Sequence, residues 1–475
     1  MKLVILDGTT GDSPASLCIR QAAPRAGATV TRFALADTRL APCLGDFDCW
    51  TQTPGRCRTQ DEAQEIAQAV HDADLVVFLT PLVFGGYSSA LKKAVDRLIP
   101  LIDAFFHERL GLTRHLPRYA KYPALLCIGL ADQPSDEARS IFADLAGGNA
   151  INLLAPSFRS LVVSLQENNW QDKIAGAVRA ALRGKPGDPL PTPGADALAL
   201  ACAPDSIAPR RRAPPRTASI LIGSARPKGK STSESLARGL AAELEKAGIK
   251  SSLVPVINFA KDGHRAEKAI RTLLSGELLV VAAPLYVDGL PSLATRALEC
   301  LAQEMRSQPH VVKGVVGILN CGFPEALHSR SALRILRLFA HESGLLWSGG
   351  LAMGGGELLH GKPLSTASFL MRAQIRALAS AARDLAAGRG ISPEASRGMA
   401  QPLVPARLFR WLAPFKWILQ ARPHGVSRKQ LHDRPLDTPV ANSYSEIAGF
   451  GRGQSNWSPR QQLKLQRASP MKPGK

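Results

Sequence analysis

The chain has 475 residues, about three times a domain of ~150 residues, so two or three domains are expected. Hydrophobic residues make up 45% and charged residues 21%, which excludes a wholly disordered, collagen-like or coiled-coil chain. The net charge of +20 suits an anionic partner such as nucleic acid, a membrane surface or a phosphorylated ligand. Residues 388–475 carry +11 of this charge, so the excess indicates a basic tail.

Cysteine usage and the apolar runs point to a cytoplasmic location. Eight cysteines are too few for a disulfide scaffold, and the N-terminus lacks the pattern of a signal peptide. Apolar runs such as 75–82 and 278–284 are far shorter than the ~20 residues that span a bilayer. They are typical of buried strands.

The first half begins with a strand, a Gly/Ser/Thr turn and a helix, the opening of a parallel α/β unit. The predicted segments are a strand at 3–7, a turn at 8–13, a helix from Ala15 to Ala23 that Pro24 would end, strands at 75–79 and 124–128, a loop at 81–89 and a helix at 90–98. Buried strands between helices predict a doubly wound sheet.

The same order returns after residue 217. The predicted segments are a strand at 218–222, a turn at 223–233, a helix through Lys246, strands at 278–283 and 315–319, and loops at 284–291 and 320–323. The fold class that follows is α/β, with two tandem doubly wound parallel sheets and a basic C-terminal extension. We expect a first domain at 1–183, a Pro/Arg-rich linker at 184–216, a second domain at 217–388 and the extension at 389–475, whose last ~30 residues are expected to be disordered.

Both strand-to-helix turns are candidates for binding a phosphate, because free backbone N–H groups and the positive end of a helix attract anions there. The first turn offers Thr9, Thr10 and Ser13 but contains Asp12, and the second is richer in donors. An ordinary N-cap explains either turn equally simply. The donors of the second turn are Ser224, Arg226, Ser231, Thr232 and Ser233. Neither turn has a Walker or dinucleotide-binding pattern.

The loops after the inner strands line the crevice where doubly wound sheets bind ligands. A flat ring could lie against either loop, although a simple turn with one buried aromatic residue is an equal alternative. The candidates are Pro81, Leu82, Phe84, Gly85 and Gly86 in the first half, and Pro284, Leu285, Tyr286, Val287, Asn320 and Gly322 in the second.

Several segments of the first half carry a family resemblance: residues 83–97, 43–50 and 53–57, with Asp61, Arg118-Tyr119 and Asn149–Asn152. Together they resemble the flavodoxin-fold NAD(P)H-dependent FMN reductases, including their iron–sulfur flavoprotein relatives. Residues 217–365 are similar to another flavodoxin-like oxidoreductase branch. The resemblance implies bound FMN, with its phosphate on the first loop and its ring on the second, reduced at N5 by NAD(P)H.

The function that follows is electron transfer from NAD(P)H through FMN to a small acceptor such as a quinone or a flavin. The flavin would carry the chemistry, so no side chain need be an acid, base or nucleophile. The ring loop favours the first half and the phosphate loop the second, which leaves open which half binds FMN. The alternative is a scaffold or partner-binding protein that has lost one or both flavin sites. Relatives often dimerise, so a homodimer is a further expectation.

Cys43, Cys49 and Cys57 stand where the iron–sulfur relatives have four cysteines, but Asp46 replaces one of them. We therefore expect no metal and no iron–sulfur cluster, although these three thiols are the weak alternative. A structural loop with a packed Trp50 is the simpler interpretation, and a Cys43–Cys49 redox pair stays open. Cys321 is expected to be a packed residue.

Residues 407–422 mix aromatic with basic side chains, as helices at membrane surfaces do. Pro414 would break or kink such a helix, and the aromatic residues Phe409, Trp411, Phe415 and Trp417 could instead pack on the second domain. We favour packing over membrane contact. A specific nucleic-acid partner is not expected, because no known binding module accompanies the charge.

Overall fold

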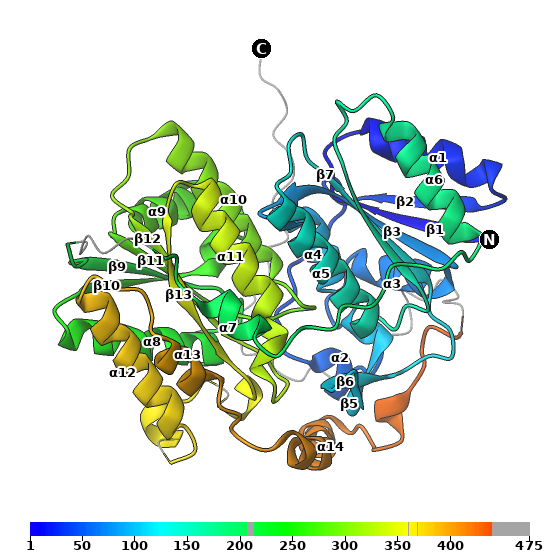
Figure 1. Cartoon of the computed structure of the whole chain (residues 1–475). Coiled ribbons are helices and arrows are strands. Elements are labelled where there is room, and N and C mark those ends of the chain that lie inside the picture. Colours follow the sequence, from blue (N-terminus) through cyan, green and yellow to red (C-terminus); the bar gives the residue numbers. More distant parts are fainter. Residues whose placement is uncertain (207–212, 360, 368, 439–475) are drawn as a thin grey trace. The chain divides into compact units, whose positions relative to one another are not determined.

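The computed structural model describes residues 1–206, 213–359, 361–367 and 369–438 (Figure 1). The chain divides into two compact units, Met1–Pro435 and Leu436–Lys475. Both predicted α/β halves lie in the first unit. The predicted disorder of the last ~30 residues falls on positions outside the described residues, as do residues 439–475 of the basic extension and 207–212 of the linker.

The first sheet has five parallel strands in the order β2-β1-β3-β7-β8, and the short β4 pairs antiparallel with β3. Its strands are β1 (Lys2–Asp7), β2 (Thr29–Ala34), β3 (Leu75–Val83), β4 (Gly86–Tyr87), β7 (Ala124–Leu130) and β8 (Phe158–Val163). Its helices are α1 (Pro14–Arg25), α3 (Ala63–Asp72), α4 (Ser89–Val95), α5 (Asp136–Asn152) and α6 (Trp170–Leu182).

The second sheet is parallel throughout, in the order β10-β9-β11-β12-β13. Its strands are β9 (Thr217–Ile222), β10 (Lys250–Pro255), β11 (Leu278–Pro284), β12 (Gly314–Asn320) and β13 (Leu346–Met353). Its helices are α8 (Thr232–Lys246), α9 (His264–Leu274), α10 (Ser292–Ser307), α11 (Arg330–Glu342) and α12 (Arg372–Ala386). Both sheets have the strand order of flavodoxin, so the prediction of two parallel α/β sheets is confirmed.

One face of each sheet is covered by a pair of helices. Alternate strand residues such as Ile5 and Val77 form a core with α1 and α6, and Ile220 and Val280 do so with α8 and α12. The other pairs, α4 with α5 and α10 with α11, meet between the halves. There α4 packs on α10 and α5 on α11, so each helix contacts its counterpart, as in an isologous dimer.

The remaining elements lie outside the two sheets. The hairpin β5 (Ile102–Arg109) and β6 (Leu112–Pro117) follows α4, α2 (Asp48–Thr51) lies in the loop after β2, and α7 (Ala197–Cys202), α13 (Pro393–Ala400) and α14 (Ala406–Ala421) come from the expected linker and extension. The 3₁₀ helices are η1 (Ile99–Leu101), η2 (Val256–Phe259), η3 (Ala326–Ser329), η4 (Gly356–Leu358), η5 (Leu364–Ala367), η6 (Arg422–His424) and η7 (Gln430–His432).

Two local predictions were wrong. The helix α1 continues past Pro24 to Arg25, and α14 continues through Pro414. Pro24 is the next-to-last residue of α1, so its missing N–H affects only the last turn of that helix. Phe409 and Trp417 hold α14 by burial on either side of Pro414. The linker also contains an ordered helix, because Cys202 is buried and the Asp205 carboxylate accepts a hydrogen bond from Trp347 N at 2.9 Å.

Helices long and apolar enough to cross a bilayer are absent from the described residues.

Candidate functional site

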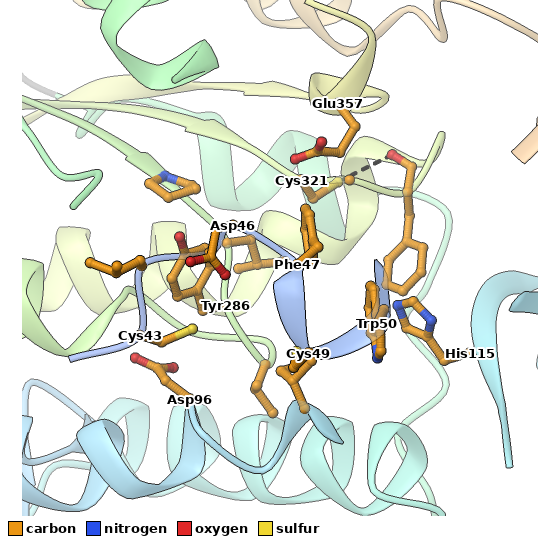
Figure 2. A pocket seen from close by; sticks show the side chains of 18 of the residues that line it. Cys43, Asp46, Phe47, Cys49, Trp50, Asp96, His115, Tyr286, Cys321 and Glu357 are labelled. Carbon is orange, nitrogen blue, oxygen red and sulfur yellow. Dashed lines mark hydrogen bonds between the residues drawn. The ribbon is translucent and has the colours of Figure 1, made fainter. Parts of the chain in front are cut away.

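A cavity of about 260 Å³ lies within the first unit, at the C-terminal ends of β9, β11 and β12 (Figure 2). Its size is close to the lower end of small-molecule pockets, about 300 Å³. The second half supplies the loops after β9, β11, β12 and β13. The first half supplies residues from 42–59, 96–99, the hairpin and 152–153, and α14 adds one helix face. Every second-half site residue that the sequence predicted lines it: Ser224, Arg226, Ser231, Thr232, Ser233, Pro284, Leu285, Tyr286, Val287, Asn320 and Gly322.

The hydroxyls at the start of α8 hold the loops in place. Ser231 Oγ caps the helix by accepting from Glu234 N at 3.2 Å, Thr232 Oγ1 donates to Gly356 O at 2.6 Å, and Ser233 Oγ donates to Asn320 Oδ1 at 2.8 Å. These bonds aim the positive N-terminal end of a 15-residue helix at the cavity. Because these hydroxyls already take part in the bonds above, an anion there would contact mainly the backbone N–H groups at the helix end and Arg226.

Two cations flank one carboxylate at this end of the cavity. Arg226 Nη2 lies 3.4 Å from Glu357 Oε1, and Lys416 Nζ of α14 lies 3.3 Å from Glu357 Oε2. Arg226 also donates from Nε to Gly45 O of the first half at 2.8 Å and stands over the Phe47 ring, 5.4 Å from its centroid. Burial lowers the pKa of Lys416, and Glu357 opposes that shift. The pair of cations suits a phosphate.

The loop 284–291 has a strained turn at the edge of the cavity. Val287 and Asp288 have φ values of 42° and 59°, in the left-handed region that a β-branched residue rarely adopts. Tyr286 and Gly289 close the turn with two backbone hydrogen bonds, at 2.9 and 3.0 Å. Such strain persists only where the surroundings hold it, and it is concentrated at functional sites.

The first half provides those surroundings. Lys92 Nζ donates to Tyr286 O at 2.7 Å, and Asn149 Nδ2 donates to Val287 O at 2.9 Å. Asn152 Nδ2 donates to Asp288 Oδ2 at 2.5 Å. Family resemblance drew attention to Asn149 and Asn152, but nothing in the sequence indicated that they act on the other half's loop.

A buried ion pair supports the same loop. Lys92 of α4 is 2% exposed and donates to Asp96, which is 1% exposed. Asp96 Oδ2 also accepts from Ser292 N, at the start of α10, at 2.9 Å. Burial raises the pKa of Asp96, and Lys92 opposes that shift. The pair therefore joins α4 of the first half to the loop and to α10 of the second.

Residues 42–59 of the first half, which include Cys43, Cys49 and Cys57, pack against the second-half loops. Gly45 has a φ of 67°, and a Cβ added there would collide with the Tyr286 hydroxyl, so this position needs glycine. Cys43, Cys49 and Cys57 all line the cavity. Burial raises the pKa of Cys43 to about 12 and that of Cys49 well above its usual value, which keeps both thiols protonated.

Among the described residues, no group of three or more His, Cys, Asp or Glu side chains is arranged to hold a metal ion. The expectation that the chain holds no iron–sulfur cluster stays a prediction. Cys321 is buried, and its Sγ donates to Phe323 O at 3.4 Å (Figure 2). This agrees with a packed residue, although the side chain also lines the cavity.

Aromatic side chains form the opposite wall of the cavity. Trp50 stacks on Phe47 with ring centroids 5.1 Å apart and meets the edge of Trp417 at 5.4 Å. The ring centroid of His115 lies 4.6 Å from that of Trp50 (Figure 2). It lies 5.2 Å from the ring centroid of Phe323. Burial lowers the pKa of His115 to about 3, so this ring is neutral at ordinary pH. The wall is therefore apolar and uncharged. Its members on the hairpin and on α14 were not predicted, because the contacts join distant parts of the chain.

The predicted residues of the first half lie outside the cavity lining: Thr9, Thr10, Ser13, Pro81, Leu82, Phe84, Gly85 and Gly86. In the first turn, Thr9 N donates to Asp7 Oδ1 at 3.0 Å, and Arg32 pairs with both Asp7 and Asp12, at 2.8 and 3.0 Å. Ser13 Oγ caps α1. The turn thus brings two carboxylates together, which disfavours a phosphate.

The first ring loop is used for packing between the halves. Phe84 is 8% exposed and meets Phe339 of α11 edge-on, with centroids 5.1 Å apart. A Cβ at Gly86 would come within 2.9 Å of Ile335 Cδ1. The small void beside this loop, about 10 Å³, holds no more than about one water. Flavin binding by the first half stays a prediction that this packing does not favour.

Comparison with known proteins confirms the predicted resemblance of the first half. Residues 1–112 match the family model of NADPH-dependent FMN reductases. An iron–sulfur flavoprotein of Methanocaldococcus jannaschii is 38% identical over 71 residues, which are 15% of this chain and 36% of that protein. The match thus spans about a third of the relative's length.

Solved structures are similar over two fifths of the chain. A putative quinone reductase from Klebsiella pneumoniae shares 16% identity with this chain and has a TM-score of 0.30. The match covers 39% of this chain and 86% of the reductase chain. An FMN-dependent NADH-azoreductase from Bacillus anthracis in complex with FMN shares 16% identity and has a TM-score of 0.29. That match covers 39% of this chain and 99% of the azoreductase chain.

Proposed function

We propose that the chain is an FMN-dependent oxidoreductase that takes electrons from NAD(P)H and passes them to a small aromatic acceptor of the quinone or flavin type. One observation carries this proposal: the phosphate turn, the ring loop and the third loop of the second half face a single cavity. The FMN reductase match of residues 1–112 supports the cofactor and the reductant.

The residues present fit FMN. Arg226, Lys416 and the N-terminal end of α8 would hold the phosphate, because cations and a helix N-terminus favour an anion. The loop at Tyr286 and Val287 would lie against the ring, held by Lys92 and Asn149. Bound FMN would accept a hydride from the nicotinamide and deliver electrons to the acceptor.

The chain's own contribution is binding, orientation and exclusion of water. Trp50 and Trp417 are 1% and 3% exposed, and they pack tightly in the apolar wall of the cavity and exclude water from it. Neutral His115 adds no charge to that wall. The protonated Cys43 and Cys49 are poor nucleophiles, so we assign them no covalent role.

The second candidate is a scaffold in which flavin sites have been lost. The carboxylates of the first turn and the packed Phe84 favour such a loss in the first half. In the second half, two cations share one carboxylate, Glu357, and a cavity lies in the corresponding place. We therefore propose one flavin site per chain.

Anaerobic addition of NADPH or NADH to the FMN-loaded protein tests the function. We expect the flavin absorbance to bleach in a first-order step whose rate saturates with nicotinamide, and to return when a soluble quinone is added. Heat-denatured protein with the same FMN is the control. A loaded protein that bleaches no faster than this control would support the scaffold.

A further inference from the structure

The helix α14 has two apolar faces. Its inner face, with Phe409, Ala413 and Trp417, is buried and lines the cavity. Its outer face has four large exposed side chains at helical spacing: Leu408, Trp411, Phe415 and Leu419, which are 42%, 64%, 55% and 61% exposed. Leu412, which is 43% exposed, lies at the border of the two faces and also lines the cavity. Trp411 and Phe415 lie one turn apart with ring centroids at 5.7 Å, so the outer residues form one stripe.

The inner contacts hold the helix in a fixed orientation. Arg410 Nη2 pairs with Glu108 Oε2 of β5 at 2.6 Å, and Lys416 pairs with Glu357 of the second half at 3.3 Å. Trp417 meets Trp50 at 5.4 Å, and Phe409 meets Phe106 at 5.5 Å. The outer stripe is therefore a fixed surface of the folded unit.

The charged side chains of this segment are all basic. Residues 401–432 contain six Lys or Arg and no Asp or Glu. Arg407 and Arg422 at the two ends of the helix are exposed, as are Arg428 and Lys429 just beyond it. The rest of the chain, 433–475, adds seven Lys or Arg against three acidic residues. An apolar stripe with Trp and Phe on a helix whose own charged residues are all basic is the pattern of a helix that lies in the interface of an anionic membrane.

We propose that α14 docks the protein on anionic phospholipid bilayers, with Trp411, Phe415 and Leu419 inserted among the lipids and the neighbouring Arg and Lys residues on the headgroups. The length and the buried inner face of the helix are consistent with lying on the surface, since no described helix can span the bilayer. A second copy of this chain fits less well, because two such surfaces would bring like charges together.

Co-sedimentation with vesicles tests this proposal on the full chain, without reference to flavin or activity. We expect binding to vesicles of phosphatidylcholine mixed with phosphatidylglycerol, and weak binding to phosphatidylcholine alone. The variant Trp411→Ser/Phe415→Ser/Leu419→Ser should bind the mixed vesicles about tenfold or more weakly. The matched control, Leu110→Ser/Leu200→Ser/Val311→Ser, removes three apolar residues that are 51%, 66% and 50% exposed elsewhere and should bind like the wild type.

Three results would overturn the proposal. Equal binding of the α14 variant and the wild type would assign vesicle binding to another basic segment. An equal loss in both triple variants would remove the specific role of α14. A wild-type chain that is dimeric, ignores vesicles and becomes monomeric in the α14 variant would show that a second copy covers the stripe. Circular dichroism of each variant confirms that it is folded.

Discussion

Replacing Ser224 by Asp raises the Kd for FMN about a hundredfold or more. Ser224 is 6% exposed and lines the cavity at the turn after β9, beside Arg226. A carboxylate there faces the proposed phosphate, and two unit charges ~4 Å apart repel by about 4 kcal/mol at an effective dielectric constant of ~20. Fluorescence titration of FMN measures the effect.

Two matched variants isolate the charge and the location. Ser224→Asn has nearly the shape of Asp without its charge and should bind FMN within about tenfold of the wild type. Thr10→Asp places the same charge in the exposed first turn and should leave the Kd unchanged. Loss of binding in Thr10→Asp together with normal binding in Ser224→Asp would move the flavin to the first half.

Replacing Lys92 by Met lowers the free energy of unfolding by about 3–5 kcal/mol, because it leaves the buried Asp96 carboxylate without its cation. It also removes the hydrogen bond to Tyr286 O that supports the strained loop. Urea denaturation measures the change. The double variant Lys92→Met/Asp96→Asn should recover most of it, since an amide can still accept from Ser292 N.

The decrease in the free energy of unfolding caused by Lys92→Met should also depend on pH. Burial already raises the pKa of Asp96, and removing Lys92 raises it further. A carboxyl whose pKa is higher in the folded chain stabilises the fold in its protonated form, so this contribution is lost as pH rises through the folded pKa. The deficit of Lys92→Met relative to the wild type should therefore be smaller near pH ~5 than near pH ~8. A deficit independent of pH would contradict the role of Asp96, and the neighbouring Lys93→Met serves as the control.

Periodicity and turn residues were sufficient to predict the two sheets, because each inner strand is an unbroken apolar run that ends in a Gly-rich turn. Residues 75–79 and 278–283 are examples, and both form central strands. Polar edge strands such as Lys250–Pro255 lack that signal and were not predicted. The hairpin Ile102–Pro117 was not predicted, because its two strands pair with each other and line the cavity and so do not follow the pattern of the two parallel sheets.

The second-half site could be predicted because its donors follow consecutive parallel strands, whose C-terminal ends meet at one edge. That both halves of the chain build the site could not be predicted from the sequence. The hydrogen bonds of Lys92 and Asn149 to the loop at Tyr286 and Val287 join residues well over a hundred positions apart. For α14, the sequence indicated either packing on the second domain or membrane contact. The structure instead packs Phe409 and Trp417 on aromatic residues of the first half and leaves Trp411 and Phe415 exposed.

The central claim is that one cavity, built by both halves, holds a single FMN per chain. Equilibrium dialysis of the full-length protein against FMN, with the protein concentration well above the Kd, measures the stoichiometry directly. The account predicts one FMN per chain in the wild type. Two per chain would show that the first half has kept a site of its own, and none would contradict the flavin assignment of the cavity.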